Sequence, residues 1–155
     1  MAIIFEPEGD ILNSVHQTLV CPVNTEGVMG SGLALAMANR YKGLLFNYRK
    51  ACRNSTLAIG NVWTYQHNSY QQILCFPTKE DWRNPSELPW IQTGLTYVAK
   101  NWRTLGIKSI VFPMIGCGKG GLDWKDVCPL IVKSLGHLPI PVIIIGPDPT
   151  VDTAE

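Results

Sequence analysis

The stretch QTLVCPVNTEGVMGSGLALAMANRY, residues 17–41, decides the fold class of this chain. Residues 17–23 form an apolar run that is typical of a β-strand. A glycine-rich loop over residues 24–32 follows directly, and a helical pattern begins at Gly32. A glycine loop between a strand and a helix is typical of α/β folds, in which ligands bind at the carboxyl ends of the strands.

The rest of the chain continues this alternation. Further apolar runs predict strands over residues 2–5, 61–65, 72–76, 109–114 and 141–145. Helical patterns cover residues 32 to about 52 with a break near Gly43, an apolar stripe from Leu88 to Gly106, and residues 124–135. We therefore expect a three-layer α/β/α fold whose six-stranded sheet is covered on both faces. The two strands that flank Asn68 and Ser69 predict an antiparallel hairpin, which makes the sheet mixed.

Length and composition limit the class of protein. A chain of 155 residues is long enough for one core, so we expect residues 1–155 to form a single domain, with disorder in the polar tail after Pro147. The 13 Lys and Arg residues nearly balance the 12 Asp and Glu residues, which argues against bulk binding to nucleic acids or membranes. No stretch approaches membrane-spanning length, and the stretch MAIIFEPEGD carries no basic targeting segment. We expect a cytoplasmic monomer with no membrane partner.

The cysteine and histidine residues predict neither disulfides nor a metal site. The five cysteines form no CxxC pair, and free thiols in a reducing compartment are expected. His16, His67 and His137 are isolated from one another and from cysteine, so we expect no metal and no cofactor. Cys117 lies inside a glycine loop and is an alternative nucleophile, although no histidine is near it in sequence.

A second glycine loop, GCGKGG over residues 116–121, also follows a predicted strand. Both loops should emerge at one edge of the sheet, where glycines let main-chain N–H groups approach a phosphate and a helix start favours negative charge. Together the loops predict a pyrophosphate ligand; the alternative is that they are ordinary turns at the sheet edge. Because Lys119 is followed by Gly120 rather than Ser or Thr, a P-loop is disfavoured. The late position of the glycines also disfavours a dinucleotide fingerprint.

Four motifs in this order resemble those of the macro domain family. They are EGDIL (8–12), CPVNTEGVMGSGLALAMANRY (21–41), CFPTKEDW (75–82) and PMIGCGKGGLDW (113–124). The likeness covers nearly the whole chain. More narrowly, the motifs resemble those of the branch that contains the glutamyl-ADP-ribose hydrolase and the hydrolase that removes ADP-ribose from thymidine in DNA. It implies a macro domain fold and an ADP-ribose ligand.

The resemblance implies particular roles for individual residues. Asp10 would accept a hydrogen bond from the adenine amino group, and Asn24 would contact the distal ribose; their ordinary alternatives are a turn former and a strand-end cap. The remaining ligand contacts would come from the two loops and from residues beside the motifs. These residues are Ile11, Gly27, Val28, Met29, Gly30, Gly32, Thr78, Ile115, Gly116, Cys117, Gly118, Lys119, Gly120 and Gly121.

Lys79 is, with Asn24, one of the two catalytic residues that the resemblance implies. Its amine would attack the anomeric carbon of the distal ribose and give an imine-type intermediate after ring opening. An amine attacks only when it is unprotonated, a state that burial or a neighbouring cation such as Lys119 favours. A charged Lys79 that stabilises the leaving group electrostatically is the alternative.

One departure from the glutamyl-specific pattern concerns the second glycine loop. Those enzymes carry an acidic residue where this chain has Gly120, and Asp123 lies three positions further on. The GGLDW pattern agrees better with the thymidine-specific branch. The general base for the last hydrolytic step is therefore not identified by the sequence.

Three functions from different classes follow. The first is a hydrolase that releases ADP-ribose from thymidine in DNA, from protein glutamate, or from ADP-ribose 1''-phosphate. The second is a non-catalytic ADP-ribose reader, which has no need of Lys79. The third is a nucleic-acid binder, for which Lys42, Arg49 and Arg53 are spaced to share one face of a helix, although a solvated face is the commoner explanation of such spacing. ADP-ribosylated DNA is accordingly a candidate partner.

Overall fold

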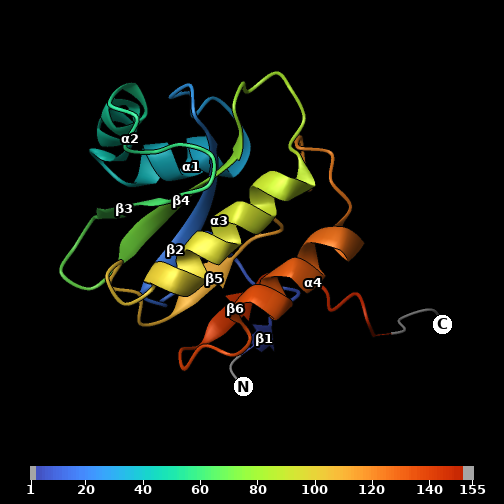
Figure 1. Cartoon of the computed structure of the whole chain (residues 1–155). Helices are drawn as coiled ribbons and strands as arrows, with labels where there is room; N and C mark the ends of the chain where they lie inside the picture. Colours follow the sequence, from blue (N-terminus) through green and yellow to red (C-terminus); the bar gives the residue numbers. More distant parts are fainter. Residues whose placement is uncertain (1–2, 152–155) are drawn as a thin grey trace.

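Six strands form one mixed sheet at the centre of the molecule (Figure 1). The computed structural model of the chain describes residues 3–151. The strands are β1 (Ile3–Phe5), β2 (Thr18–Asn24), β3 (Trp63–Gln66), β4 (Gln72–Lys79), β5 (Ile110–Phe112) and β6 (Val142–Ile144). Their order across the sheet is β1-β6-β5-β2-β4-β3. All neighbouring pairs are parallel except β3 and β4, so the expected mixed sheet with one antiparallel hairpin is confirmed.

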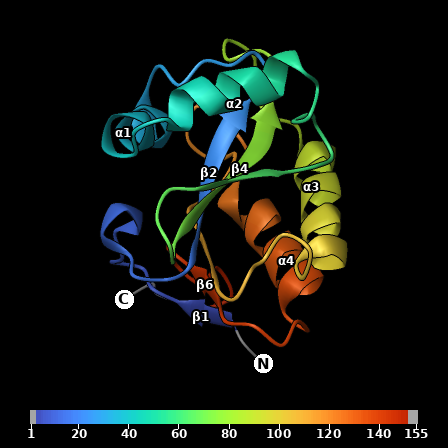
Figure 2. The ribbon, with the colours of Figure 1, turned by 90° about the vertical axis from the view of Figure 1, so that its left-hand side faces the viewer.

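Helices cover both faces of this sheet. They are α1 (Gly32–Arg40), α2 (Leu44–Arg53), α3 (Leu88–Asn101) and α4 (Trp124–Leu135), and a 3-10 turn, η1, spans Ile11–Asn13. Alternate strand residues point to opposite sides: Val20 and Leu74 pack with α3 and α4, whereas Leu19 and Ile73 pack with α1 and α2. Figure 2 shows the two helical layers on either side of β2 and β4. The expected three-layer arrangement is therefore confirmed.

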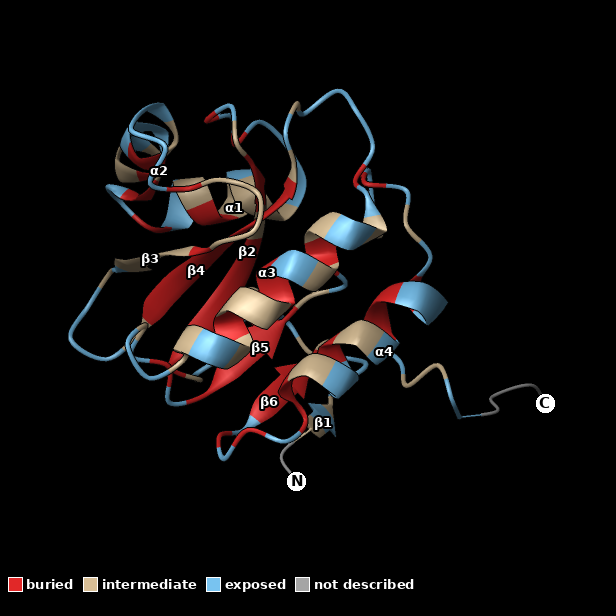
Figure 3. Cartoon of the chain, in the orientation of Figure 1, coloured by how far each residue is buried: buried red, intermediate tan, exposed pale blue. Residues whose placement is uncertain are grey.

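Burial follows the layers. The inner strands β2, β4, β5 and β6 are almost wholly buried, whereas the edge strands β1 and β3 are partly exposed, and each helix is buried only where it meets the sheet (Figure 3). Both faces of β5 and β6 are covered, which explains why these strands read as unbroken apolar runs in the sequence.

Some element boundaries differ from the sequence prediction, and one predicted boundary is confirmed. The hairpin loop extends over residues 67–71, because Gln66 pairs with Gln72. The helix predicted to end at Gly106 ends at Asn101, and hydrogen-bonded turns continue to Gly106. The predicted break near Gly43 is confirmed, because Gly43 adopts a left-handed conformation with φ of 85°.

The segment after β6 is held by Trp124, whose indole N–H donates to the Pro147 carbonyl at 2.8 Å. Of the tail for which disorder is expected, residues 148–151 form a turn in which Asp148 accepts from Thr150. Residues 152–155 lie outside the described residues. No helix within residues 3–151 has the length and apolar character needed to cross a bilayer.

Candidate functional site

Three loops lie at the carboxyl edge of neighbouring strands. The first glycine loop, residues 24–32, follows β2; the second glycine loop, residues 116–121, follows β5, the neighbour of β2. On the other side of β2, β4 leads into a third loop, residues 80–87, which we call the bridging loop. The expectation that both glycine loops emerge at one edge is confirmed, and the bridging loop joins them there.

Asn24 organises the first glycine loop. It is the last residue of β2 and is 7% exposed. Its Oδ1 accepts hydrogen bonds from the main-chain N–H groups of Glu26, Gly27 and Val28 at 3.0, 3.1 and 3.2 Å. Its Nδ2 donates to the Val28 carbonyl at 2.8 Å. One of the two side-chain N–H groups is thus engaged by the loop, and no partner of the second is found among the described residues.

Two residues of α2 hold this arrangement in place, and the sequence prediction did not include Tyr48 among the site residues. The hydroxyl of the buried Tyr48 lies 2.6 Å from the Asn24 carbonyl oxygen and 2.9 Å from Asn24 Oδ1. Burial raises the pKa of the Tyr48 phenol, so the hydroxyl remains a donor at neutral pH. Arg49 Nε donates to the Gly27 carbonyl at 3.1 Å. A tyrosine on the otherwise apolar face Leu44, Tyr48, Ala51 was the signal available in the sequence.

Lys79 is placed beside the first glycine loop by an irregularity in strand pairing. Val23 pairs with Pro77, yet Asn24 pairs with Lys79, so β4 carries Thr78 as an extra residue at this point. A bulge of this kind redirects the following side chain. The Thr25 N–H donates to the Lys79 carbonyl at 3.1 Å, and Lys79 Nζ donates to the Trp82 carbonyl at 3.2 Å. Asn24 and Lys79 are therefore neighbours across two strand ends.

The bridging loop contacts both glycine loops. Trp82 N–H donates to Glu26 Oε1 at 3.3 Å, and Thr25 Oγ1 donates to the Glu80 carbonyl at 3.3 Å. At its other end, Ser86 N–H donates to the Gly120 carbonyl at 2.9 Å. The Ser86 hydroxyl is buried and has no partner among the described residues. The three loops therefore form one connected frame around the strand ends.

The glycines of the second loop differ in how much space surrounds them. A Cβ added to Gly120 would collide with the Gly116 carbonyl oxygen and lie 2.5 Å from Ser86 Oγ. A Cβ added to Gly118 would meet nothing within 4 Å, and Gly118 and Lys119 are both exposed. Gly120 is thus required by the packing of the loop, whereas Gly118 faces open space.

The helix starts that follow the two glycine loops are not equivalent. Ser31 at the start of α1 makes no side-chain capping bond, so the first N–H groups of α1 lack that partner. At the start of α4, the Asp123 carboxylate accepts from the Lys125 N–H at 3.0 Å. The start of α4 already has a carboxylate at the position that an anion would take, whereas the start of α1 has none, so the electrostatics favour an anion at α1.

Four of the other predicted contact residues can be placed by their burial and hydrogen bonds. The side chains of Ile11, Met29 and Ile115 are buried in the core, so their loops can offer a ligand main-chain groups. Asp10 is exposed, and its carboxylate accepts from Leu12 N–H at 3.1 Å and from Asn13 Nδ2 at 2.7 Å, which caps η1. The structure thus shows Asp10 in the turn-forming role, which the sequence offered as the alternative to adenine binding. Its carboxylate oxygens retain lone pairs that could accept from a further donor.

Burial disfavours Cys117 as a nucleophile. It raises the pKa of the Cys117 thiol to about 11, with the Asp123 charge as a smaller contribution. The thiol therefore stays protonated at neutral pH, and Sγ lies 3.4 Å from the Ile115 carbonyl oxygen.

An open groove of about 470 Å³ lies elsewhere, between α3 and α4. Its lining contains none of the predicted site residues. Within residues 3–151, no three His, Cys, Asp or Glu side chains gather closely enough to hold a metal ion.

We predict that Tyr48→Phe loosens the first glycine loop. The substitution leaves the Asn24 acceptors without the Tyr48 donor at a cost of about 1–3 kcal/mol, which lowers Tm by roughly 3–8 °C. Thermal melts check this, with Tyr41→Phe as the matched control because no hydrogen bond involves the Tyr41 hydroxyl among the described residues. Equal melting temperatures for the two variants would contradict the role assigned to Tyr48.

The described residues thus form an α/β/α domain with two glycine loops and a bridging loop at the carboxyl edge of its sheet. The macro domain model matches residues 20–131, and the chain belongs to the macro domain family. The resemblance found in the sequence motifs is confirmed.

Several relatives refine this membership. A DNA ADP-ribosyl transferase–DNA ADP-ribosyl glycohydrolase fusion protein of Thermosipho africanus is 37% identical, covering 90% of this chain and 41% of that protein. A DNA ADP-ribosyl glycohydrolase of Mycobacterium tuberculosis is 39% identical, covering 90% of this chain and 40% of the relative. The chain thus spans about two fifths of the length of these relatives.

Solved structures show where the match lies. The macrodomain of Mycobacterium tuberculosis DarG is 37% identical with a TM-score of 0.87, covering 94% of this chain and 98% of that one. Thermosipho africanus DarTG in complex with ADP-ribose is 38% identical with a TM-score of 0.85, covering 90% of this chain and 40% of that one. The chain therefore matches the macrodomain portion of proteins of this kind.

Proposed function

We propose that this chain is an ADP-ribosyl hydrolase that releases ADP-ribose from thymidine in DNA. The single observation that carries the proposal is the placement of Lys79 beside Asn24, where the first glycine loop and the bridging loop meet. A domain that only binds ADP-ribose needs the glycine loops but gains nothing from an amine at this position. The names of the relatives, DNA ADP-ribosyl glycohydrolases, support the same reading.

In the proposed complex each loop has a separate task. The diphosphate lies against the main chain of the two glycine loops, near the free N–H groups at the start of α1. The distal ribose lies at Asn24, and the exposed Asp10 meets the adenine. All three loops belong to one chain, so we propose that the site works as a monomer.

The proposed reaction uses the Lys79 amine at the anomeric carbon. In the unprotonated state Nζ forms a bond to that carbon, the bond to the thymine nitrogen breaks, and the proton that Nζ then loses is transferred to this nitrogen as the base leaves. Opening of the ribose ring gives an imine, which water hydrolyses to free ADP-ribose and regenerated Lys79. Trp82, whose carbonyl holds Nζ at 3.2 Å, positions the amine before the ligand arrives.

Thymidine is favoured over glutamate because of the second glycine loop. A carboxylate side chain at position 120 would need a Cβ where the Gly116 carbonyl oxygen lies. The site therefore has no place for the acid that the glutamyl-specific enzymes are expected to use. Water would have to be oriented by main-chain groups, with the unpartnered Ser86 hydroxyl the nearest buried side-chain oxygen to Gly120.

Binding is tested by thermal shift. Free ADP-ribose at about a hundred times its Kd should stabilise the fold by about 2.7 kcal/mol and raise Tm by roughly 5–10 °C. Adenosine should give a much smaller shift, because the glycine loops need a diphosphate to bind. Equal shifts from the two compounds would remove the glycine loops from the binding site.

The acceptor is tested by a panel of ADP-ribosylated substrates assayed for released ADP-ribose. The panel contains ADP-ribosylated thymidine in an oligonucleotide, ADP-ribosylated glutamate in a peptide, and ADP-ribose 1''-phosphate. We expect the thymidine substrate to be cleaved with the highest kcat/KM. Faster cleavage of the glutamate substrate would overturn the choice of acceptor, and no cleavage of any member would leave a reader of ADP-ribose.

A further inference from the structure

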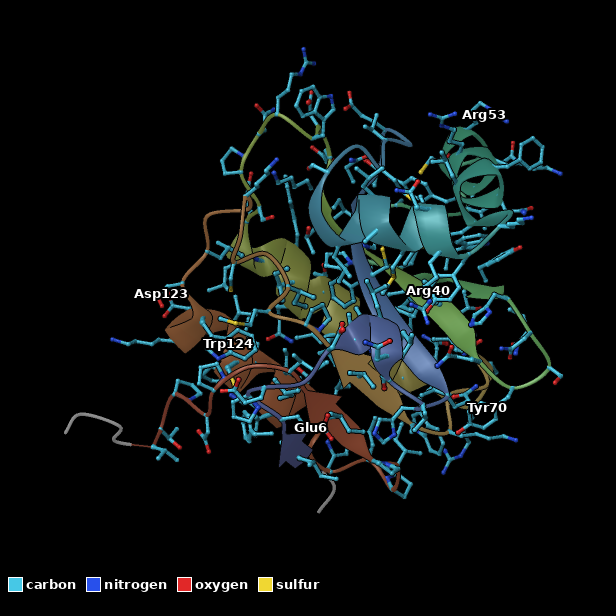
Figure 4. The ribbon with its side chains drawn as sticks, turned by 180° about the vertical axis from the view of Figure 1, so that it is seen from behind. Glu6, Arg40, Arg53, Tyr70, Asp123 and Trp124 are labelled. Atoms are coloured by element: carbon cyan, nitrogen blue, oxygen red, sulfur yellow. The ribbon has the colours of Figure 1, made fainter. Side chains whose placement is uncertain are left out.

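The charges of this near-neutral chain are distributed unevenly. Six of the 13 Lys and Arg residues lie between positions 27 and 79, whereas none of the 12 Asp and Glu residues do. That segment includes α1 and α2 and ends at Lys79. Figure 4 shows Arg40 and Arg53 on the α1–α2 side of the molecule, well separated from Glu6 and Asp123. The excess of positive charge therefore lies in the layer of α1 and α2 rather than over the whole surface.

Helix α2 concentrates these cations on one exposed face. Phe46, Arg49, Lys50 and Arg53 are all exposed and are spaced i, i+3, i+4 and i+7, so they share the side opposite the buried Tyr48. Lys42, which the spacing placed with them, lies instead in the turn before α2. The only ion pair within the described part of the chain joins Arg83 to Asp81, so the cations of this face form no ion pair there.

The face begins at the proposed active site. Arg49 Nε donates to the Gly27 carbonyl at 3.1 Å, and Tyr48 on the other side of the helix holds Asn24. In Figure 2, α2 runs across the upper ends of β2 and β4, where Asn24 and Lys79 lie. A polymer attached to the leaving thymine therefore passes close to α2.

Phe46 distinguishes the kind of polyanion that suits this face. Its ring is 68% exposed, although an aromatic side chain normally packs inside. Exposed aromatic rings among cations provide stacking surfaces for unpaired bases, with the cations on the phosphates, and this combination is typical of single-strand binding without sequence preference. The distance from Phe46 to Arg53 along the helix is roughly 10 Å, which fits a short stretch of strand.

We propose that the exposed face of α2, formed by Phe46, Arg49, Lys50 and Arg53, binds the single-stranded DNA that flanks the ADP-ribosylated thymidine. This inference rests on the proposed function and adds to it the surface that holds the strand on either side of the modified base. Lys50 and Arg53 contact phosphates, Phe46 stacks on a base, and Arg49 connects this face to the first glycine loop. The contacts position the strand without reading its sequence.

The test compares two substrates in wild type and in Lys50→Glu/Arg53→Glu. One substrate is a single strand of about 12 nucleotides with one ADP-ribosylated thymidine, and the other is the ADP-ribosylated nucleoside alone. In wild type we expect kcat/KM to be at least about tenfold higher for the strand at low salt. The double variant should lose this advantage, reduce the salt slope by about 1.4 (about 0.7 for each phosphate contact), and cleave the nucleoside at the wild-type rate.

Lys100→Glu/Lys133→Glu is the matched control, because it makes the same charge change on α3 and α4, on the other face of the sheet. It should keep the advantage of the strand. Phe46→Ala should reduce that advantage without changing the salt slope.

Wild type that cleaves both substrates equally at every salt concentration would overturn the inference while the proposed function stands. Wild type that cleaves neither would overturn the proposed function itself. A duplex cleaved as well as the single strand would overturn the role of Phe46.

Discussion

Lys79→Ala should lower the turnover of ADP-ribosylated thymidine by at least about a hundredfold while leaving the Kd for ADP-ribose within a few-fold of wild type. The reason is that the glycine loops and Asn24 bind the ligand, whereas Lys79 contributes the amine. Steady-state kinetics and calorimetric titration of the same preparations measure the two quantities. The side chain is partly exposed and donates one hydrogen bond, to Trp82, so the variant should fold.

Lys79→Arg separates the two chemical roles of this residue. A guanidinium remains protonated and cannot attack the ribose, so a nucleophilic role predicts an activity nearly as low as that of Lys79→Ala. A purely electrostatic role predicts partial activity. Borohydride added during turnover should attach ADP-ribose to Lys79 in the wild type if the imine forms. Wild-type turnover in Lys79→Ala would make Lys79 an ordinary turn lysine.

Gly118→Val and Gly120→Val should have opposite consequences, although the positions are two residues apart. Gly118→Val should weaken ADP-ribose binding by at least about tenfold with little change in Tm, because its side chain enters open space where the main chain approaches the diphosphate. Gly120→Val should lower Tm, because its Cβ collides with the Gly116 carbonyl and crowds Ser86 at a cost of about 1–3 kcal/mol.

Thermal melts and ADP-ribose titrations of both variants check this pair. Each variant is the control for the other, because the residue introduced and the loop are the same. Normal ADP-ribose binding by a stable Gly118→Val variant would show that the second glycine loop is only a surface turn. An unchanged Tm in Gly120→Val would mean that the loop can rearrange, and position 120 could then carry an acid after all.

Much of this fold could be predicted from the sequence because its signals are local. The apolar run before the first glycine loop, the glycine at the α1–α2 break and the stripe on α3 each depend on residues within one element. The end of α3 was predicted too late, because hydrogen-bonded turns at residues 102–106 continue the apolar pattern of the helix. The prediction that Lys42 shares a helical face with Arg49 and Arg53 was wrong, because the helix starts after Gly43.

The parts of the site that the sequence did not predict depend on contacts between distant residues. Tyr48 reaches Asn24 across 24 positions, and Ser86 meets Gly120 through the main chain. The extra residue Thr78 is visible only in the pairing of β2 with β4. Periodicity and motif spacing carry no information about such pairings, so the neighbours of Asn24 and Lys79 required the folded chain.

The most direct measurement of the central claim is mass spectrometry of a single-stranded oligonucleotide that carries one ADP-ribosylated thymidine, after incubation with the wild-type chain. We expect complete conversion to the unmodified strand, with one equivalent of free ADP-ribose and no fragment of it left on the base. Lys79→Ala should leave the modified strand intact over the same time. A modified strand that survives at saturating wild-type protein, although ADP-ribose binds, would contradict the assignment of this macro domain as a hydrolase.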